Sequence, residues 1–485
     1  MASGRDICPS ESKRHADSGV ESRARPDKRS RFGIFSAGVD DVHKRWVLLA
    51  LASGILTQRF SIAAERDIPT VRALLAEPSQ LAQWLADQDP AIVAAQARVD
   101  AAVELREQAT TLPNPQLTAS AGGFVIGHTN PRTPRLGLGE TTAISAGLTE
   151  LVELGKRGPR QRAARLRADA AAQLGAATLS GRLSEATLTL GKLAYVSAKR
   201  AVVAENLRAA QTLASLEKIR RDHADLSGAE YSRIELETQQ LALQLARTEA
   251  DVAVAVAMCG AILHTRCPTD DAIDATALDA GAPIPTKLPA GLGVDQAIDR
   301  RPGRRAAQLE KSALEADATL ASHRAIPDLT LSVGYTLDNL TVAGNQHQTL
   351  MFAVGAPLPL FDRGANDAAA ARASARAIDA EQRAVVREAR GQVEALLAQR
   401  TTLEATVTQL QSEALPRSAQ IVQQTRHAFD LGQTGLAELL LAERAHRQLV
   451  LDVLDTRFDL FNVRAQLRQV LGIDDQVALT VRAQR

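Results

Sequence analysis

Hydrophobic and polar positions alternate in one short part of the chain and recur with helical spacing almost everywhere else. Between residues 326 and 364, Asp328–Leu337 and Thr349–Leu360 each alternate apolar with small polar residues, as half-buried strands do. Pro357 and Pro359 are expected to end the second run, because proline cannot donate to a sheet ladder. The pattern predicts a β-hairpin between long helices. Since two strands alone are marginal in water, something further must complete the sheet.

The same order of patterns occurs earlier in the chain. Two pairs of prolines bracket alanine-rich helical runs at identical spacing: Pro90 with Pro115, and Pro302 with Pro327. A Leu-Thr pair and two alternating runs follow each second proline, and in the first half those runs are 117–125 and 142–152. We therefore predict a tandem repeat of helix, hairpin, helix and helix, with copies at 80–260 and 293–472.

Apolar residues recur every three and four positions along the helical runs. The seams of 158–222 and 436–471 contain Leu183, Ala186, Leu190, Leu193, Leu439, Val453, Leu460 and Leu467. A longer seam extends from Val386 to Leu431, and Pro416 is expected to kink that run. Helices of this length that reverse at Gly432–Gly435 are expected to pack as antiparallel coiled coils.

The N-terminal part indicates export. Residues 1–42 are polar and aperiodic, and we expect a disordered extension there. Residues 43–64 combine a basic flank, an apolar core from Trp46 to Leu56 and a small-residue stretch, as a secretory signal peptide does. The alternative is a buried helix. Because a signal peptide normally stands at the N-terminus, translation is expected to start near Val42. No other segment approaches the roughly 20 apolar residues of a membrane-spanning helix.

Residues 261–292 are expected to link the two halves, and 473–485 to form a C-terminal tail. The prolines of the linker are Pro268, Pro283, Pro285 and Pro289. Cys259 and Cys267 lie at its start, and in an oxidising compartment they could form a disulfide or remain two free thiols. Their spacing lacks the further ligands that a zinc site needs.

Composition and motifs disfavour several classes of function. The chain is 45% hydrophobic and 23% charged with a net charge of +1, so it is globular and shows no sign of nucleic-acid binding. It contains no P-loop, no nucleophile elbow and no His-Glu-x-x-His motif, and its nine histidines form no ligand pair at helical spacing. We expect no enzymatic activity, no cofactor and no tight metal site.

One chain cannot close the predicted sheet. It offers two strands in each half, whereas membrane-spanning barrels begin at about eight strands, and an open sheet edge is not tolerated in lipid. If the protein spans a membrane, several copies must contribute strands, and cyclic symmetry is the simplest arrangement. Three chains would supply twelve strands.

Several features together resemble the TolC-like outer-membrane efflux channels. They are the two-fold repeat and the motifs Leu112-Pro-Asn-Pro-Gln-Leu117, Arg324-Ala-Ile-Pro-Asp-Leu-Thr330 and Pro357-Leu-Pro-Leu-Phe-Asp-Arg-Gly364. Glu153-Leu-Gly-Lys-Arg-Gly158 is similar to a run of the CzcC-like (cobalt-zinc-cadmium) heavy-metal branch, with one glycine missing. The resemblance covers about residues 80–472.

The resemblance implies a fold class, partners and a location. The fold would be mainly α with a small β part: long antiparallel coiled-coil helices plus four strands per chain that complete a twelve-stranded trimeric β-barrel. The homotrimer would stand in outer-membrane lipid of the cell, with its helical tunnel in the periplasm. A periplasmic adaptor (membrane fusion) protein and an inner-membrane efflux pump would deliver its substrates.

The resemblance therefore implies a passive exit duct of a tripartite efflux system, carrying divalent heavy-metal cations. One alternative is a drug or polypeptide export duct of the same family. Another, from a different class, is a periplasmic coiled-coil structural or adaptor protein.

The helix reversals and two acids near them are the candidate site residues. The expected adaptor-docking tips contain Asp222, Asp225, Ser227, Gly228, Asp430, Gly432, Gln433 and Gly435. The family pattern places two acids after the glycine of the last turn, and they fall on Glu438 and Leu441, so only the first acid is present here. Glu438 and its counterpart Glu230 are the entrance or gate candidates, because rings of carboxylates attract cations. The alternative is that both are acids favoured by a helix dipole, in ordinary solvated turns.

Overall fold

The computed structural model describes residues 69–124, 138–268, 275–282, 294–339 and 346–483. The predicted extension 1–42 and signal peptide 43–64 lie outside these residues. The described residues fall in one unit, Ile68–Arg485. None of their helices is long and apolar enough to cross a membrane.

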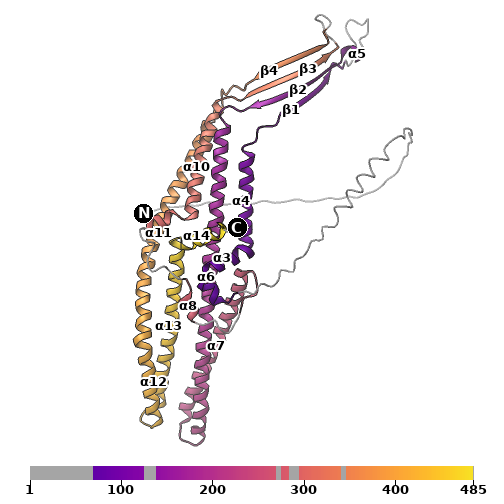
Figure 1. Ribbon diagram of the computed structural model, residues 1–485. Coiled ribbons are helices and arrows are strands. Elements are labelled where there is room, and N and C mark those ends of the chain that lie inside the picture. The colour runs from indigo at the N-terminus through magenta and orange to yellow at the C-terminus, as the bar shows by residue number, and fades with distance from the viewer. Residues whose placement is uncertain (1–68, 125–137, 269–274, 283–293, 340–345, 484–485) are drawn as a thin grey trace, which may run out of the picture. The chain divides into compact units, whose positions relative to one another are not determined.

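Long helices make up most of this unit (Figure 1). The main helices are α3 (Pro78–Gln88), α4 (Pro90–Gln108), α6 (Arg157–Asp222), α7 (Gly228–Leu263), α10 (Pro302–Ser322), α11 (Ala365–Gln409), α12 (Leu415–Asp430), α13 (Leu436–Val470) and α14 (Ile473–Ala483). Short helices are α2 (Val71–Ala76), α5 (Leu138–Thr141), α8 (Thr276–Ala280), α9 (Val294–Asp299), the 3₁₀ turn η1 (His323–Ala325) and the π-helical η2 (Leu410–Ala414). The predicted fold class, mainly helical with a small β part, is confirmed.

The strands form one antiparallel sheet at one end of the helices (Figure 1). They are β1 (Gln116–Gly122), β2 (Ala143–Val152), β3 (Leu329–Asp338) and β4 (Gln348–Gly355), paired in the order β1-β2-β3-β4. The two hairpins therefore join through β2 and β3. The prediction that the last strand continues to Leu360 is wrong, because Pro357 and Pro359 take the chain out of the ladder after Gly355.

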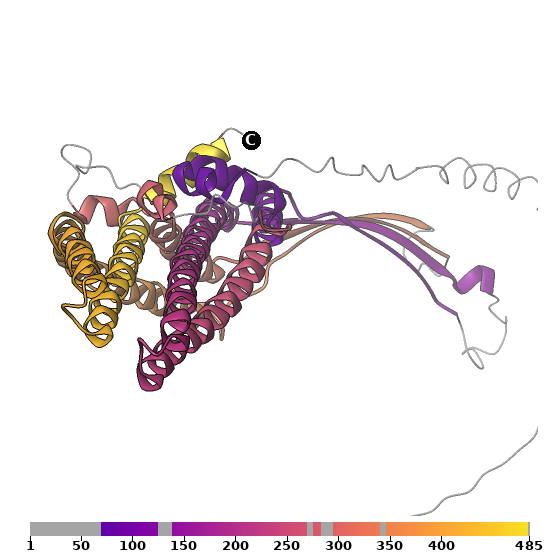
Figure 2. The ribbon, with the colours of Figure 1, turned by 90° about the horizontal axis from the view of Figure 1, so that it is seen from below.

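The helices below the sheet follow the same order as the strands. α4 packs on α6, α6 on α10 and α10 on α11, and farther from the sheet α6 packs on α7 while α12 packs on α13. Figure 2, seen from below, shows these last four as two adjacent helical hairpins. The element order α4-β1-β2-α6-α7 thus recurs as α10-β3-β4-α11/α12-α13.

All residues of the predicted seams of α6 and α13 are buried. In the long predicted seam of α11 and α12, by contrast, residues near the C-terminal end are exposed. Ile421 and Leu431 are exposed, whereas Phe429 is buried. The cause is η2, which lies just before Pro416. A π-helical turn adds one residue, so every later side chain is rotated by about 100°. The helical register therefore changes just before Pro416.

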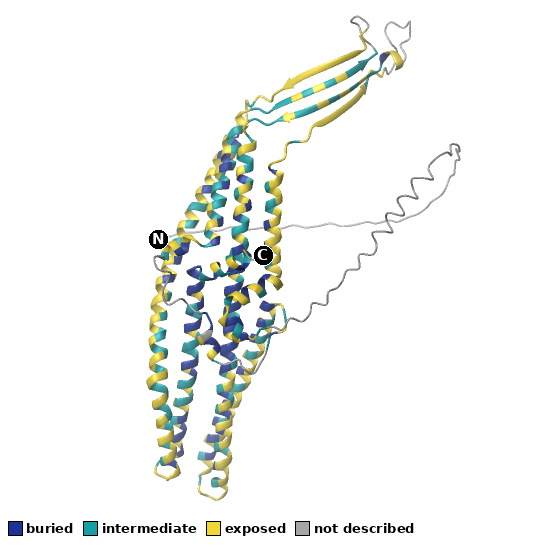
Figure 3. Ribbon diagram, in the orientation of Figure 1, coloured by how far each residue is buried: buried dark blue, intermediate teal, exposed yellow. Residues whose placement is uncertain are grey.

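The largest core lies midway along the helices and draws on both halves (Figure 3). Leu85 of α3, Leu190 of α6 and Phe461 of α13 are buried there. Leu278 of α8 joins them from within the expected linker, and Val481 of α14 joins from the expected tail. Both segments therefore contribute apolar side chains to the core.

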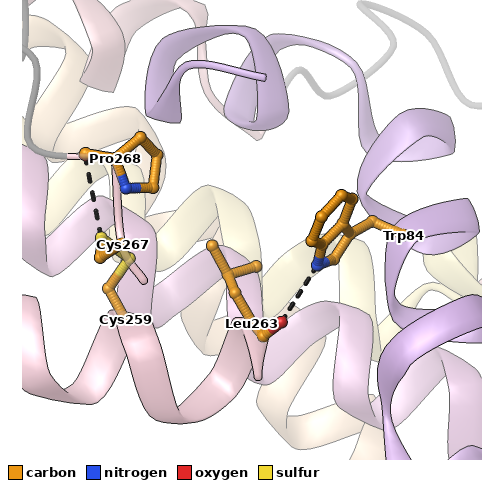
Figure 4. The surroundings of a disulfide bond; sticks show 5 residues. All are labelled: Trp84, Cys259, Leu263, Cys267 and Pro268. Carbon is orange, nitrogen blue, oxygen red and sulfur yellow. Dashed lines mark hydrogen bonds between the residues drawn. A yellow bond between two sulfur atoms is a disulfide. The ribbon is translucent and has the colours of Figure 1, made fainter. Parts of the chain in front are cut away.

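The end of α7 is fixed beside this core (Figure 4). Cys259 and Cys267 form a disulfide with their Cα atoms 5.6 Å apart. His264 between them adopts a left-handed conformation that ends the helix. The indole N–H of Trp84 donates to the carbonyl of Leu263 at 3.1 Å, which satisfies one acceptor at the helix end.

Candidate functional site

The sheet sorts its side chains into an apolar face and a polar face. Register places Leu117, Leu148, Val333 and Phe352 in one row across all strands, and Ala119, Ala146, Tyr335 and Leu350 in the next such row. The opposite face carries the rows Thr118, Gly147, Gly334, Met351 and Ser120, Ser145, Thr336, Thr349. Phe352 is 75% exposed and Leu117 is 76% exposed, so no described part of the chain covers the apolar face.

Both edges of the sheet are open within the described chain. β1 pairs only with β2, and β4 pairs only with β3. Unpaired strand edges are templates for pairing with another chain. Because the strands alternate in direction and are even in number, β4 of one copy would run antiparallel to β1 of another.

The junction between sheet and helices is held by ion pairs and backbone contacts. Lys156 Nζ lies 2.7 Å from Asp328 Oδ2, and the amide of Leu154 donates to Asp328 Oδ1 at 3.2 Å. These contacts join the end of β2 to the start of β3. The residues involved belong to the motifs Glu153–Gly158 and Arg324–Thr330. The junction therefore fixes the sheet relative to the top of α6.

The two helix reversals share one backbone geometry. In the first, the amide of Asp225 donates to the carbonyl of Arg220 at 2.8 Å, and in the second Gln433 donates to Ala428 at 2.8 Å. This pairing, with one residue in the left-handed region, is the Schellman motif. That residue is Ala224, with φ 64°, in the first turn and Gly432, with φ 69°, in the second.

The helices that leave the two turns are capped differently. Ser227 and Glu230 form a capping box at the start of α7: the amide of Glu230 donates to Ser227 Oγ at 3.2 Å, and Ser227 N donates to Glu230 Oε2 at 3.3 Å. The hydrogen bonds from Ser227 lower the pKa of Glu230. At the start of α13 the cap is Gly435, which has no side chain.

This difference separates the two entrance candidates. Glu438 occupies the place in α13 that Glu230 occupies in α7, but its side chain is exposed and makes no hydrogen bond or ion pair with the described residues. Glu230 is engaged in the cap, so it has a structural role. Leu441, at the position of the family's second acid, is 68% exposed. Glu438 is the free carboxylate of the pair.

The structure brings the two predicted tips together. Ile234 of α7 is buried against Phe429, Leu436 and Leu439 of the second hairpin. The predicted docking residues share exposure to solvent: Asp222, Asp225, Ser227, Gly228, Asp430, Gly432, Gln433 and Gly435. Apolar packing therefore fixes the tips side by side and leaves these residues on the surface.

An ion-pair network around the buried carboxylates of Glu237 and Glu443, behind the tips, was not predicted from the sequence. Arg447 Nη2 lies 2.5 Å from Glu237 Oε1, and Arg447 Nη1 lies 3.3 Å from Glu443 Oε2. Arg444 also pairs with Glu237, and Arg426 pairs with Glu443. The network links α7, α12 and α13. Its sequence signal is a charged residue at a seam position, as Glu443 is three residues after Leu440 in α13.

Metal-ligating side chains do not gather in the described chain. No group of three or more His, Cys, Asp or Glu side chains there is placed to hold a metal ion. The arrangement offers exposed single carboxylates, open sheet edges and an apolar sheet face.

Comparison with known proteins gives one family match and many structural matches. Residues 293–473, the second half, match the family model described as outer membrane efflux protein. A search of curated proteins finds no match.

Solved structures share the fold over most of the chain. A crystal structure of CusC, from work on the conformational changes that accompany folding and transmembrane channel formation, matches with a TM-score of 0.69 at 18% identity. The match covers 84% of this chain and 95% of that chain. The outer membrane protein VceC of Vibrio cholerae has a TM-score of 0.65 at 18% identity, over 84% of this chain and 99% of that chain. The open-state MtrE outer membrane channel of Neisseria gonorrhoeae has a TM-score of 0.64 at 16% identity, over 81% and 88%. The family model thus matches the second half of the chain, and the solved structures share the fold of the whole described unit.

Proposed function

We propose that this protein is the outer-membrane channel of a tripartite efflux system, a passive duct built from three copies of the chain. The observation that carries the proposal is the sheet: its apolar face is exposed and both of its edges are open. A lipid environment would cover the apolar face, and pairing β4 with β1 of the next copy would satisfy the edges. Three chains then close a ring of twelve strands whose polar rows face the lumen.

Two substitutions in β4 test this assignment. Phe352 lies on the apolar face and Met351 on the polar face, and both are exposed in the single chain. A lysine on a lipid face costs about 2–4 kcal/mol near the bilayer midplane, whereas lumen positions tolerate charge. Phe352→Lys should therefore abolish the heat-sensitive trimer in outer-membrane fractions, and Met351→Lys should preserve it. A soluble monomeric wild-type protein, or equal effects of both substitutions, would overturn the proposal.

The hairpin tips are the proposed docking site for a periplasmic adaptor, which would connect the duct to an inner-membrane pump. Supporting this, the predicted tip residues are exposed and lie at the end of the unit opposite the sheet (Figure 1). Site-specific photo-cross-linkers at Asp225 and Gln433 should capture the adaptor in cells. The matched control is His347 beside β4, which should capture none. Capture only from His347 would mean that the adaptor meets the sheet end of the protein and not the hairpin tips.

For substrate we propose divalent heavy-metal cations. The support is the run Glu153–Gly158, which resembles the heavy-metal branch, together with the free carboxylate of Glu438. Deleting the gene should sensitise cells to divalent metal salts, and restored expression should reverse this. Sensitivity to drugs alone would favour the alternative of a drug export duct. A periplasmic scaffold or adaptor is not favoured, because its sheet would expose an apolar face to water.

A further inference from the structure

The unit has two sides, each running from the sheet down to a helix tip. On one side α4 leads into β1 and begins where α7 ends: Nε2 of His264, which ends α7, lies 3.4 Å from Oδ1 of Asp89, which caps α4. On the other side β4 is followed by α11, η2 and α12. Between these sides the lower helices pack in the row α7-α6-α13-α12 (Figure 2). A copy that pairs with a sheet edge therefore brings α7 of one chain beside α11 and α12 of the next.

α7 carries an apolar stripe on the side away from α6. Leu241 is buried against Leu207 and Ala210 of α6. At about 100° per residue, the stripe lies about 140° or more around the helix from Leu241. Its members, all exposed, are Leu236, Leu243, Ala250, Val254 and Ala257. Leu243 is 62% exposed and Val254 is 60% exposed, so no described part of the chain covers this outer stripe.

The same face of the repeat-related helix is already paired inside the chain. With the starts of α7 and α13 aligned, Arg247 holds the place of Asp455, and Ala250 holds that of Phe458. Asp455 accepts a hydrogen bond from the hydroxyl of Tyr195 in α6 at 2.7 Å, and Phe458 stacks on the same tyrosine ring. In α13 this face therefore packs on the first helix of the neighbouring hairpin. For α7 the equivalent neighbour lies in another copy, because the row of this chain ends at α7.

The side of α11 and η2 away from α13 carries small residues at the same spacing. Leu403 packs in the core cluster shared with α13, and Ala398 and Ala405 lie about 140° or more around the helix from it. Small exposed residues recur at every seventh position along this side: Gly391, Ala398, Ala405 and Ser412. The outer stripe has the same interval in Leu236, Leu243, Ala250 and Ala257. Seven-residue spacing on two facing helices is the pattern of a coiled coil.

Contacts at the tips set the relative heights of the two sides. Ile234 of α7 lies in one apolar cluster with Phe429 of α12. Since α7 rises from the tips and α12 descends to them, equal counts from these two residues keep equal heights, at about 1.5 Å per residue. The count brings Ala250 level with Ser412 to within about one residue. A rotation axis parallel to the helices leaves this height unchanged in the next copy.

A second route across the row gives the same level to within about one helical turn. Its contacts are Leu241 with Ala210, Tyr195 with Asp455, and His446 with Ser418. The two routes use different helices, so the level does not depend on one contact.

Charges of opposite sign lie beside this level. Arg247 is exposed on α7 and Glu413 is exposed in η2. Neither makes an ion pair with any residue that the structure describes, and the count from the tips places them within about one turn of each other in height. Charged side chains that flank the core positions of a coiled coil form ion pairs between its helices.

We propose that α7 of one copy packs antiparallel on α11, η2 and α12 of the next copy, with Ala250 facing Ser412 and Arg247 paired with Glu413. The partner is a second copy of this chain, since the outer stripe continues the open sheet edge above it and repeats a contact that the chain makes within itself. It also meets an opposite charge at its own height. The inference rests on the proposed homotrimer, and it fixes the register in which the lower helices of adjacent chains join.

Engineered cysteines test this contact in the purified protein, without an adaptor. The thiols of Cys259 and Cys267 are consumed in the disulfide. In a Cys8→Ser background, Ala250→Cys/Ser412→Cys should give covalent dimers and trimers with a bis-maleimide reagent that spans about one helical turn. Each single variant should stay monomeric on a denaturing gel. So should Ala250→Cys/Ala398→Cys, whose second cysteine lies on the same side of α11 but about 20 Å higher.

Two sets of substitutions give an independent readout. Arg247→Glu or Glu413→Arg alone should lower the temperature at which the trimer dissociates in detergent, and the double reversal should restore it. Leu243→Glu should also lower that temperature. Leu216→Glu is the matched control and should not, because Leu216 is 56% exposed on α6, in the middle of the row.

The outcomes separate this contact from the proposed function. A wild-type trimer without cross-links in Ala250→Cys/Ser412→Cys, or with equal cross-linking in the displaced pair, overturns the contact and leaves the proposed function standing. Capture of another protein in cells, without cross-links between copies, would make an adaptor the occupant of the outer stripe and also overturns the contact. A monomeric wild-type protein overturns both.

Discussion

At the residue scale, the two hairpin turns adopt one backbone path with different side chains. The left-handed position is Ala224 in the first turn and Gly432 in the second. An L-residue pays about 1–2 kcal/mol for that conformation, and glycine does not. A Cβ added at Gly432 would meet no atom within 4 Å, so only the backbone distinguishes the two residues there.

Exchanging these residues should therefore have opposite effects. Ala224→Gly should stabilise the α6–α7 turn by about 0.5–1 kcal/mol, allowing for the greater freedom of glycine in the unfolded chain. Gly432→Ala should destabilise the α12–α13 turn by a similar amount. Hydrogen exchange of the turn amides, read by mass spectrometry, measures both. Changes of the same sign would show that the turns are not governed by the left-handed residue.

The cap of α7 should depend on pH. Hydrogen bonds from Ser227 hold the pKa of Glu230 below its ordinary value of 4.5. A carboxylate with a depressed folded pKa contributes stability that is present above its ordinary pKa and is lost as pH falls through the folded pKa. Protection of the first amides of α7 should decline on acidification in that range. Glu230→Gln and Ser227→Ala should each remove this pH dependence. If the pH dependence persists in either variant, the cap is not its origin.

At the element scale, close approach decides which glycines matter. A Cβ built on Gly191 of α6 would lie 2.0 Å from Cε1 of Phe461, whereas one built on Gly181 of the same helix meets nothing within 4 Å. Phe461 is among the largest fully buried side chains. The glycine at 191 lets α13 approach α6.

Two alanine substitutions should separate packing from helix propensity. Gly191→Ala should lower stability by about 1–3 kcal/mol, because it overpacks the ring of Phe461. Gly181→Ala should raise stability by up to about 1 kcal/mol through helix propensity alone. Thermal unfolding followed by circular dichroism measures both. Stabilisation by Gly191→Ala would contradict the packing at Phe461.

The disulfide is an element-scale constraint on the end of α7. Cys259 and Cys267 close a loop with a sequence separation of 8. Chain-entropy arguments give such a loop about 2.5 kcal/mol of stabilisation. The double variant Cys259→Ser/Cys267→Ser should be less stable by about that free energy and should melt at a lower temperature. A reductant should lower the melting temperature of the wild type but not that of the variant. Equal melting of both would mean that the bond does not form.

Periodic features of single elements could be predicted from the sequence, and contacts between elements could not. The seams of α6 and α13 and the alternation in β3 follow from local spacing alone. The shift at Ile421 was missed because a π-helical turn changes the register without leaving a local pattern. The partners of Glu237 depend on how α7 meets α13, which no local rule gives. Glu438 and Glu230 looked equivalent until the capping residues were placed in three dimensions.

At the scale of the whole molecule, symmetry would turn single residues into rings. Under the proposed threefold assembly, each exposed Glu438 becomes one of three facing carboxylates near the tip, and such rings favour cations. Because Leu441 stands where the resembled family pattern has its second acid, only one such ring is expected. The preference for cations should therefore be weaker than in a channel with both acids.

Planar-bilayer recordings of the purified trimer should detect the ring. Glu438→Gln should reduce selectivity for cations over anions and weaken block by multivalent cations, while the melting temperature stays unchanged. Glu230→Gln is the matched control, because that carboxylate is engaged by Ser227, and it should change selectivity less. Unaltered conductance, selectivity and block in Glu438→Gln, with a lower melting temperature, would make Glu438 a helix-end residue only.

Electron cryomicroscopy of the purified protein in lipid nanodiscs would show how the chains assemble and where the sheet lies. We predict threefold symmetry, with β4 of each chain beside β1 of the next, the apolar face of the sheet against the lipid, and the helical hairpins projecting away from the disc. A particle without threefold symmetry, or one whose sheet lies outside the lipid with its edges unpaired, would contradict it.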